Sequence, residues 1–70
     1  MTKHKTADKA EAAAKKLLGF AARGSKIAVY QFSAGHWNYC TTTSEIYRNL
    51  SESDDIYPGV KAQTWEHRYL

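Results

Sequence analysis

Three histidines and one cysteine are the side chains of this sequence that could bind a transition metal or act with a nucleophile. His36 and Cys40 are separated by three residues, whereas His4 and His67 lie far from both. A structural zinc site needs about four ligands in closely spaced pairs, and a catalytic thiol needs a base within hydrogen-bond reach. His36 and Cys40 alone meet neither requirement. Two ligands are too few for zinc, and His36 falls at a predicted turn whereas Cys40 lies well along a strand, out of reach of the histidine. We therefore expect no metal site, and Cys40 is interpreted as a small buried apolar residue.

Acid–base chemistry is the next possibility, since Glu52, Asp54 and Asp55 lie close together in the stretch SESDDIYPG. This stretch is polar and turn-forming, so we expect a solvated loop in which no buried carboxyl pair can form. The sequence also contains no glycine-rich phosphate loop and no GxSxG nucleophile motif. We predict a protein that is not an enzyme and that uses no cofactor.

Charge is distributed unevenly along the chain. Residues 1–26 contain seven Lys and Arg against two Asp and Glu, whereas residues 27–70 contain three against five. Basic side chains release counterions from nucleic acid, and exposed aromatic rings can stack on bases. Contacts to DNA or RNA would come from Lys5, Lys9, Lys15, Lys16, Arg23 and Lys26. The alternative is a solvated lysine face that keeps a small protein in solution.

The chain length limits how these residues can be positioned. Seventy residues, 43% hydrophobic and 24% charged, are typical of one folded domain. A core of this size supplies about 3–5 kcal/mol of folding stability unless a disulfide or a metal adds to it, and a single cysteine cannot form an internal disulfide. We expect one domain over residues 1–70, with a flexible tail at residues 1–5, and we keep association with another chain as an option.

Targeting signals and membrane helices are not predicted. No apolar run approaches the roughly 18 residues of a membrane helix, and the N-terminus lacks the apolar region of a secretion signal. We expect a cytoplasmic protein that does not contact a membrane.

Residues 6–23 predict a helix, since alanine is the best helix former and Thr6 can cap its start. Gly24 is the expected stop, and Gly19 lies inside the predicted helix. The apolar positions of this helix are mostly alanine, so the element that packs against it must supply volume.

Residues 26–33 and 37–43 predict two strands joined by a turn at residues 33–36. A loop of two or four residues would pair Phe32 with Trp37 and Tyr30 with Tyr39, placing four aromatic rings on one face. A loop of three residues would shift the register by one and divide the rings between both faces. We interpret the aromatic row mainly as core packed on the alanine-rich helix, the alternative being an exposed platform.

The last part of the chain predicts a short helix over residues 43–50 and a third strand over residues 60–69. Thr42 and Glu45 match a capping box, although this stretch could also extend the preceding strand. The predicted fold class is α+β, with an N-terminal helix on a three-stranded, mostly antiparallel sheet in the order α-β-β-(short α)-β.

A macromolecular binding module whose main target is another protein is the function that these features favour. Small domains without a catalytic motif include accessory, regulatory and inhibitor proteins, among them phage-encoded inhibitors. Large aromatic residues dominate interface hot spots, and charges around them steer the partner. The chosen anchors are Trp37, Trp65 and Tyr69, and the chosen rim is Lys15, Lys16, Asp54 and Asp55. A homodimer is a further option, and binding to DNA or RNA is the alternative function.

Overall fold

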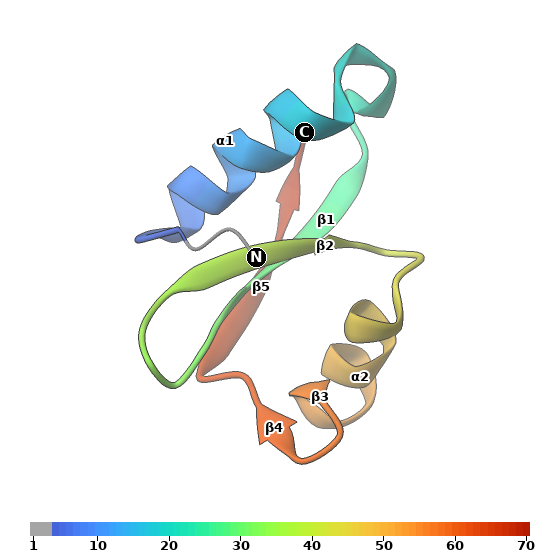
Figure 1. The fold of residues 1–70 in the computed structure, drawn as a ribbon. Helices are drawn as coiled ribbons and strands as arrows, with labels where there is room; N and C mark the ends of the chain where they lie inside the picture. Colours follow the sequence, from blue (N-terminus) through green and yellow to red (C-terminus); the bar gives the residue numbers. More distant parts are fainter. Residues whose placement is uncertain (1–3) are drawn as a thin grey trace.

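The computed structural model describes residues 4–70 and has the predicted α+β fold (Figure 1). In chain order the elements are α1 (Ala7–Leu18), a 3-10 turn η1 (Phe20–Ala22), β1 (Lys26–Gln31), β2 (Trp37–Thr41), α2 (Glu45–Ser53), β3 (Asp55–Tyr57), β4 (Val60–Lys61) and β5 (Thr64–Tyr69). The three long strands form an antiparallel sheet in the order β2-β1-β5, and β3 pairs with β4 in a separate hairpin. The central strand β1 therefore pairs with β2, which follows it directly, and with β5, the last strand of the chain.

Helix α1 begins as predicted but ends earlier. The Thr6 side chain accepts a hydrogen bond from the Lys9 backbone N–H at 3.1 Å and caps the first turn. The predicted helix over residues 6–23 is wrong beyond Leu18, because Gly19 adopts a φ of 75° that only glycine reaches without strain. The chain then forms the short η1 turn before entering β1.

The β1–β2 hairpin closes with a loop of three residues, Ser33 to Gly35. The Phe32 N–H donates to the His36 carbonyl at 2.9 Å, and Val29 lies opposite Tyr39. The register with all four aromatic rings on one face is therefore wrong, and the three-residue alternative holds. A loop one residue shorter or longer would have reversed the side of the sheet that the second strand's side chains occupy.

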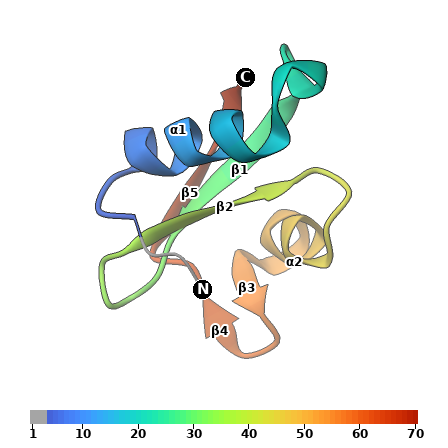
Figure 2. The ribbon, with the colours of Figure 1, turned by 45° about the horizontal axis from the view of Figure 1, so that its top comes forward.

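The aromatic rings are consequently divided between two cores, one on each face of the sheet. Helix α1 lies over one face of the sheet and α2 over the other (Figures 1 and 2). On the face toward α1, the small Ala10 and Ala14 pack against Ile27 and Val29, with Trp37 and Tyr39 at the border. We call this the α1 face. On the opposite face, called the α2 face, the buried residues and the aromatic residues packed on them are Ala28, Tyr30, Cys40, Leu50, Ile56, Phe32, Tyr47 and Trp65. The alanines of α1 do pack against larger side chains, as predicted, but the buried ones are the aliphatic Ile27 and Val29.

Helix α2 is longer than predicted and starts later. Its cap is Ser44, whose hydroxyl accepts from the Tyr47 N–H at 3.1 Å, so the capping box predicted at Thr42 is wrong. The helix runs to Ser53 and ends where Asp54 adopts the left-handed conformation, with a φ of 60°. Neither α1 nor α2, the helices of residues 4–70, has the length and apolar character required to cross a membrane.

The segment after α2 is more ordered than the predicted loop. Residues 55–57 form β3, which turns through Pro58 and Gly59 into β4. The third strand predicted over residues 60–69 is interrupted between β4 and β5, because the chain changes its pairing partner there: the Ala62 N–H donates to the Asp54 carbonyl at 2.9 Å, and the Gln63 N–H donates to the Gln31 carbonyl of β1 at 2.8 Å. Residues 1–3 of the predicted tail lie outside the described residues, and His4 forms a backbone bridge with Trp37.

Candidate protein-binding surface

Two large apolar side chains project into solvent where α1 ends. Phe20 is 81% exposed and Leu17 is 70% exposed. The neighbouring Leu18 packs against the α1 face, so one turn of helix places one leucine inside and the other outside. The break at Gly19 then places Phe20 in the η1 turn instead of in a continued helix. Sequence reasoning placed both residues within a regular amphipathic helix and missed this exposed pair.

Basic side chains border the exposed pair. Lys15 and Lys16 occupy the last turn of α1, where cations interact favourably with the helix dipole. The Arg23 guanidinium carbon lies 5.6 Å from the centre of the Phe20 ring. We define the α1-end patch as Lys15, Lys16, Leu17, Phe20 and Arg23. Beside it is an open hollow of about 450 Å³, lined by Lys15, Gly19, Phe20, Arg23 and Leu70.

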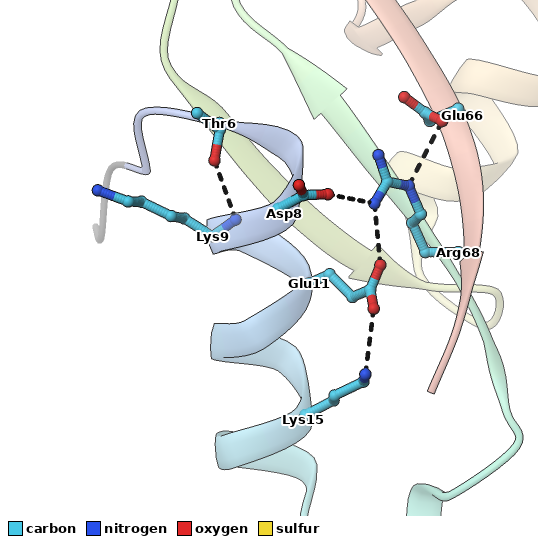
Figure 3. Close-up of polar contacts among 7 residues, drawn as sticks. All are labelled: Thr6, Asp8, Lys9, Glu11, Lys15, Glu66 and Arg68. Atoms are coloured by element: carbon cyan, nitrogen blue, oxygen red, sulfur yellow. Dashed lines mark hydrogen bonds and ion pairs between the residues drawn. The ribbon is translucent and has the colours of Figure 1, made fainter.

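An ionic network joins the first half of α1 to β5 (Figure 3). Arg68 of β5 donates from Nη1 to Asp8 at 2.7 Å and to Glu11 at 3.0 Å, and from Nε to Glu66 at 3.4 Å. Glu11 in turn pairs with Lys15 at 3.2 Å. Hydrogen bonds from Arg68 and then Lys15 lower the pKa of Glu11. The network fixes α1 on the sheet and positions Lys15 beside the hollow.

The local half of this network was readable from the sequence. Asp8, Glu11 and Lys15 are spaced by three and four residues, which places neighbouring charges on one side of a helix. Arg68, however, lies 57 residues from Glu11 in the sequence. No local pattern could have brought it into the network.

The structure separates the predicted aromatic anchors. Trp37 is half-buried at the border of the α1 face, whereas Trp65 and Tyr69 point to the α2 face. Trp65 is also half-buried, and its indole N–H donates to the Asp54 carboxylate at 2.9 Å. Tyr69 is 66% exposed. Trp65 and Tyr69 are therefore brought together on one side of the sheet, without Trp37.

The predicted charged rim is divided in the same way. Lys15 and Lys16 belong to the α1-end patch, and Asp54 and Asp55 lie where α2 joins β3. Asp55 forms an ion pair with Lys61 at 3.1 Å. Asp55 thus contacts the β3–β4 hairpin and Asp54 contacts Trp65, so both border a different surface from the two lysines.

The predicted nucleic-acid residues do not form one continuous row. Lys5, Lys9 and Lys16 are exposed, and among residues 4–70 none of the three has a carboxylate within 4 Å. Lys15 is paired with Glu11, Arg23 lies beside Phe20, and Lys26 begins β1. Two unpaired lysines on α1, Lys9 and Lys16, and Lys5 just before the helix are what remains for contacts to a phosphate backbone on this side of the molecule.

The candidate chemical residues occupy structural positions. Cys40 is buried, and burial raises the pKa of its thiol, so the reactive thiolate is disfavoured. The His36 ring stacks on Phe32 with 4.3 Å between ring centres, and His67 Nε2 lies 2.9 Å from the Tyr47 hydroxyl. Within the part of the chain that the structure describes, no three His, Cys, Asp or Glu side chains gather as metal ligands would.

Comparisons with known proteins show no relationship: no protein-family model matches the chain, and no curated protein or solved structure is significantly similar to it. The function has to be inferred from the surface itself.

Proposed function

We propose that this protein is a non-enzymatic binding module for another protein, and that the α1-end patch contacts a partner surface that is apolar at its centre and acidic around it. The exposure of Phe20 carries this proposal. Placing an aromatic side chain in water forgoes the largest apolar burial available to a residue, about 1.5–3 kcal/mol. A chain of this size has little stability to spare, so an aromatic left outside its core is well suited to a partner's pocket.

The residues around Phe20 fit the same role. Arginine and large aromatic residues are enriched at the centres of interfaces, where surrounding contacts exclude water. Arg23 already lies against the Phe20 ring, so the pair could enter an interface as one preformed unit. Preorganisation of this kind reduces the entropy lost on binding.

Charge selects the class of partner. The excess of basic residues lies in residues 1–26, which include α1 and the whole α1-end patch. Such a surface attracts an acidic partner over distances of about one Debye length, roughly 8 Å at physiological salt. An accessory or inhibitory protein that masks an acidic surface is the role that these features support best.

Binding to DNA or RNA is the second candidate. It is supported by the exposed Lys9 and Lys16 on α1 and Lys5 just before it, which lack an acidic partner among the residues described. A protein target is favoured over it because the exposed residues at the end of α1 are aliphatic as well as aromatic. Leu17 has no planar face on which a base could stack.

The experiment is affinity capture from a lysate of the source organism with three baits: the unchanged protein, Phe20→Ala, and Tyr57→Ala as the matched control. Tyr57 is an exposed aromatic of β3, outside the patch. A true partner is retained by the unchanged protein and by the control and is lost with Phe20→Ala. Circular dichroism verifies that each bait is folded, and little change is expected for a residue as exposed as Phe20.

Titration of the purified partner then gives the magnitude. Phe20→Ala is expected to cost about 2 kcal/mol, or roughly thirty-fold in affinity. Lys16→Glu is expected to slow association and weaken its salt dependence while changing dissociation little. Equal retention of the same proteins by all three baits would rule out the α1-end patch as the binding surface.

A further inference from the structure

Strand β5 has a free edge. It pairs with β1 on one side, and no strand within residues 4–70 pairs with its other side. The opposite edge of the sheet differs, because the backbone of His4 bridges Trp37 of β2 through two hydrogen bonds of 3.1 and 2.7 Å. An open strand edge presents unpaired N–H and C=O groups that can bind another strand. We infer that β5 pairs antiparallel with β5 of a second copy of this chain, forming a two-fold dimer.

The backbone of β5 presents its free groups at alternate residues. The Phe32 N–H donates to the His36 carbonyl at the end of the hairpin, so the backbone N–H and C=O groups of the even residues of β1 point toward β2. Those of the odd residues, Ile27 among them, point toward β5. Their partners in β5 are the even residues, such as Arg68 opposite Ile27. The outward groups therefore belong to Trp65, His67 and Tyr69.

Symmetry limits how two copies of this edge can meet. A two-fold axis that joins antiparallel edges stands perpendicular to the sheet, so residues from the same face lie opposite each other. Near the middle of β5, such an axis passes through Glu66, His67 or Arg68. An axis at Glu66 opposes two glutamates, and an axis at Arg68 opposes two arginines. An axis at His67 places Glu66 of each copy opposite Arg68 of the other, and opposite charges across strands are stabilising.

The His67-centred register also suits the other side chains of the strand. It places Trp65 of one copy opposite Tyr69 of the other on the α2 face, where Tyr69 is 66% exposed in the single chain. Aromatic cross-strand pairs are among the most stabilising in sheets. Arg68 uses Nε and Nη1 for its contacts within the chain, so Nη2 is available to donate to a carboxylate of the second copy. The His67-centred register thus pairs opposite charges on one face and aromatic rings on the other.

The surrounding elements leave this edge accessible. The apolar face of α1 packs mainly on β1 and β2, and α1 contacts the end of β5 through Arg68 and Leu70. The side chains exposed on β5 are those of Thr64, Glu66, His67 and Tyr69. Pairing through β5 would produce a six-stranded sheet whose outer edges are the two β2 strands, each bridged by its own His4. The contact is closed, so association stops at two chains. The inference is independent of the identity of any target.

Cross-linking from single positions tests the register directly. Within a Cys40→Ser background, His67→Cys places the two thiols on the proposed axis, where facing Cα atoms of a hydrogen-bonded pair lie about 5.5 Å apart, within disulfide range. Glu66→Cys is the matched neighbour and reports the alternative axis. Under mild oxidation, His67→Cys is expected to form a covalent dimer at least ten times faster than Glu66→Cys. Equal rates, or a faster Glu66→Cys, would overturn the register.

Sedimentation equilibrium of the unchanged protein tests the dimer itself. The expected mass at high concentration is twice the 7.9 kDa of one chain. Glu66→Arg opposes like charges twice per dimer and is expected to weaken dimerisation at least about tenfold. Glu45→Arg on α2 makes the same change of net charge outside β5 and should leave dimerisation unchanged. A protein that stays monomeric to millimolar concentration, or a dimer that tolerates Glu66→Arg as well as Glu45→Arg, would refute the inference.

Discussion

Arg68→Ala removes the guanidinium that holds α1 against β5, and its cost can be worked out from the three carboxylates involved. Asp8 and Glu66 are both exposed, so each of these two pairs contributes between about 0 and 1 kcal/mol. The side chains of Glu11 and Arg68 are only 20% and 25% exposed. A charged hydrogen bond that is largely shielded from water contributes about 1.5–3 kcal/mol. Partial exposure and the remaining Lys15 contact reduce this, so we expect a loss of about 2 kcal/mol in the free energy of unfolding.

The pH dependence of this loss is a second observable. The pKa of Glu11 is lower in the folded protein than in the unfolded chain, because Arg68 and Lys15 donate hydrogen bonds to the carboxylate. The unfolded chain therefore binds more protons as the pH falls below about 5. The stabilisation by Glu11 is fully present at neutral pH and is lost as the pH falls through the lowered pKa. The difference between Arg68→Ala and the unchanged protein should be largest at pH 7 and shrink below about pH 4.

Urea unfolding followed by circular dichroism at pH 7 and at pH 3 measures both quantities. Protein concentrations should be low enough that each variant is monomeric, because association would add to the apparent stability. Arg48→Ala is the control, since Arg48 contacts Glu45 and Glu52 on α2 with all three side chains exposed. It should cost less than about 0.5 kcal/mol. The reasoning fails if Arg68→Ala costs no more than Arg48→Ala, or if its cost does not change with pH.

Two further predictions concern the helices. Ser44→Ala should destabilise the protein by about 1 kcal/mol in urea unfolding because it removes the cap of α2, whereas Thr42→Ala should cost less than half as much; the reverse order would contradict the observed start of α2. If the exposed lysines of α1 bind nucleic acid, affinity for single-stranded DNA should fall between 50 and 200 mM salt with a log–log slope of about −0.7 per phosphate contact, and Lys9→Ala with Lys16→Ala should reduce that slope by about 1.4. An unchanged slope would exclude these lysines as phosphate contacts.

The hairpin shows how far local sequence patterns reach. Strand propensity placed both strands of the hairpin to within two residues of their observed ends, because β-branched and aromatic residues favour extended backbone. It could not give the length of the loop, since Ser33, Ala34 and Gly35 suit several turns. The difference of one residue in loop length decides that Tyr39 lies on the α1 face and Tyr30 on the α2 face.

The candidate surface was predictable only in part. The basic character of Lys15, Lys16 and Arg23 is visible in the sequence, and all three belong to the α1-end patch. The exposure of Phe20 depends on Gly19 ending the helix, and a glycine near a helix end is compatible either with continuation or with a stop. Side-chain burial is a tertiary property, so helical periodicity alone placed Phe20 beside the apolar stripe.

The position of β1 between β2 and β5 constrains when the protein can fold during synthesis. The first partner of β1, residues 37–41, is synthesised soon after it. The second partner, residues 64–69, is synthesised more than thirty residues later. Until β5 has emerged from the ribosome, Trp65 cannot pack on the α2 face and Arg68 cannot bind the carboxylates of α1. A nascent chain therefore exposes a two-stranded hairpin with an uncovered central strand until β5 leaves the exit tunnel. Such an intermediate is open to pairing with other chains, so slow translation before β5 should favour aggregation or chaperone capture.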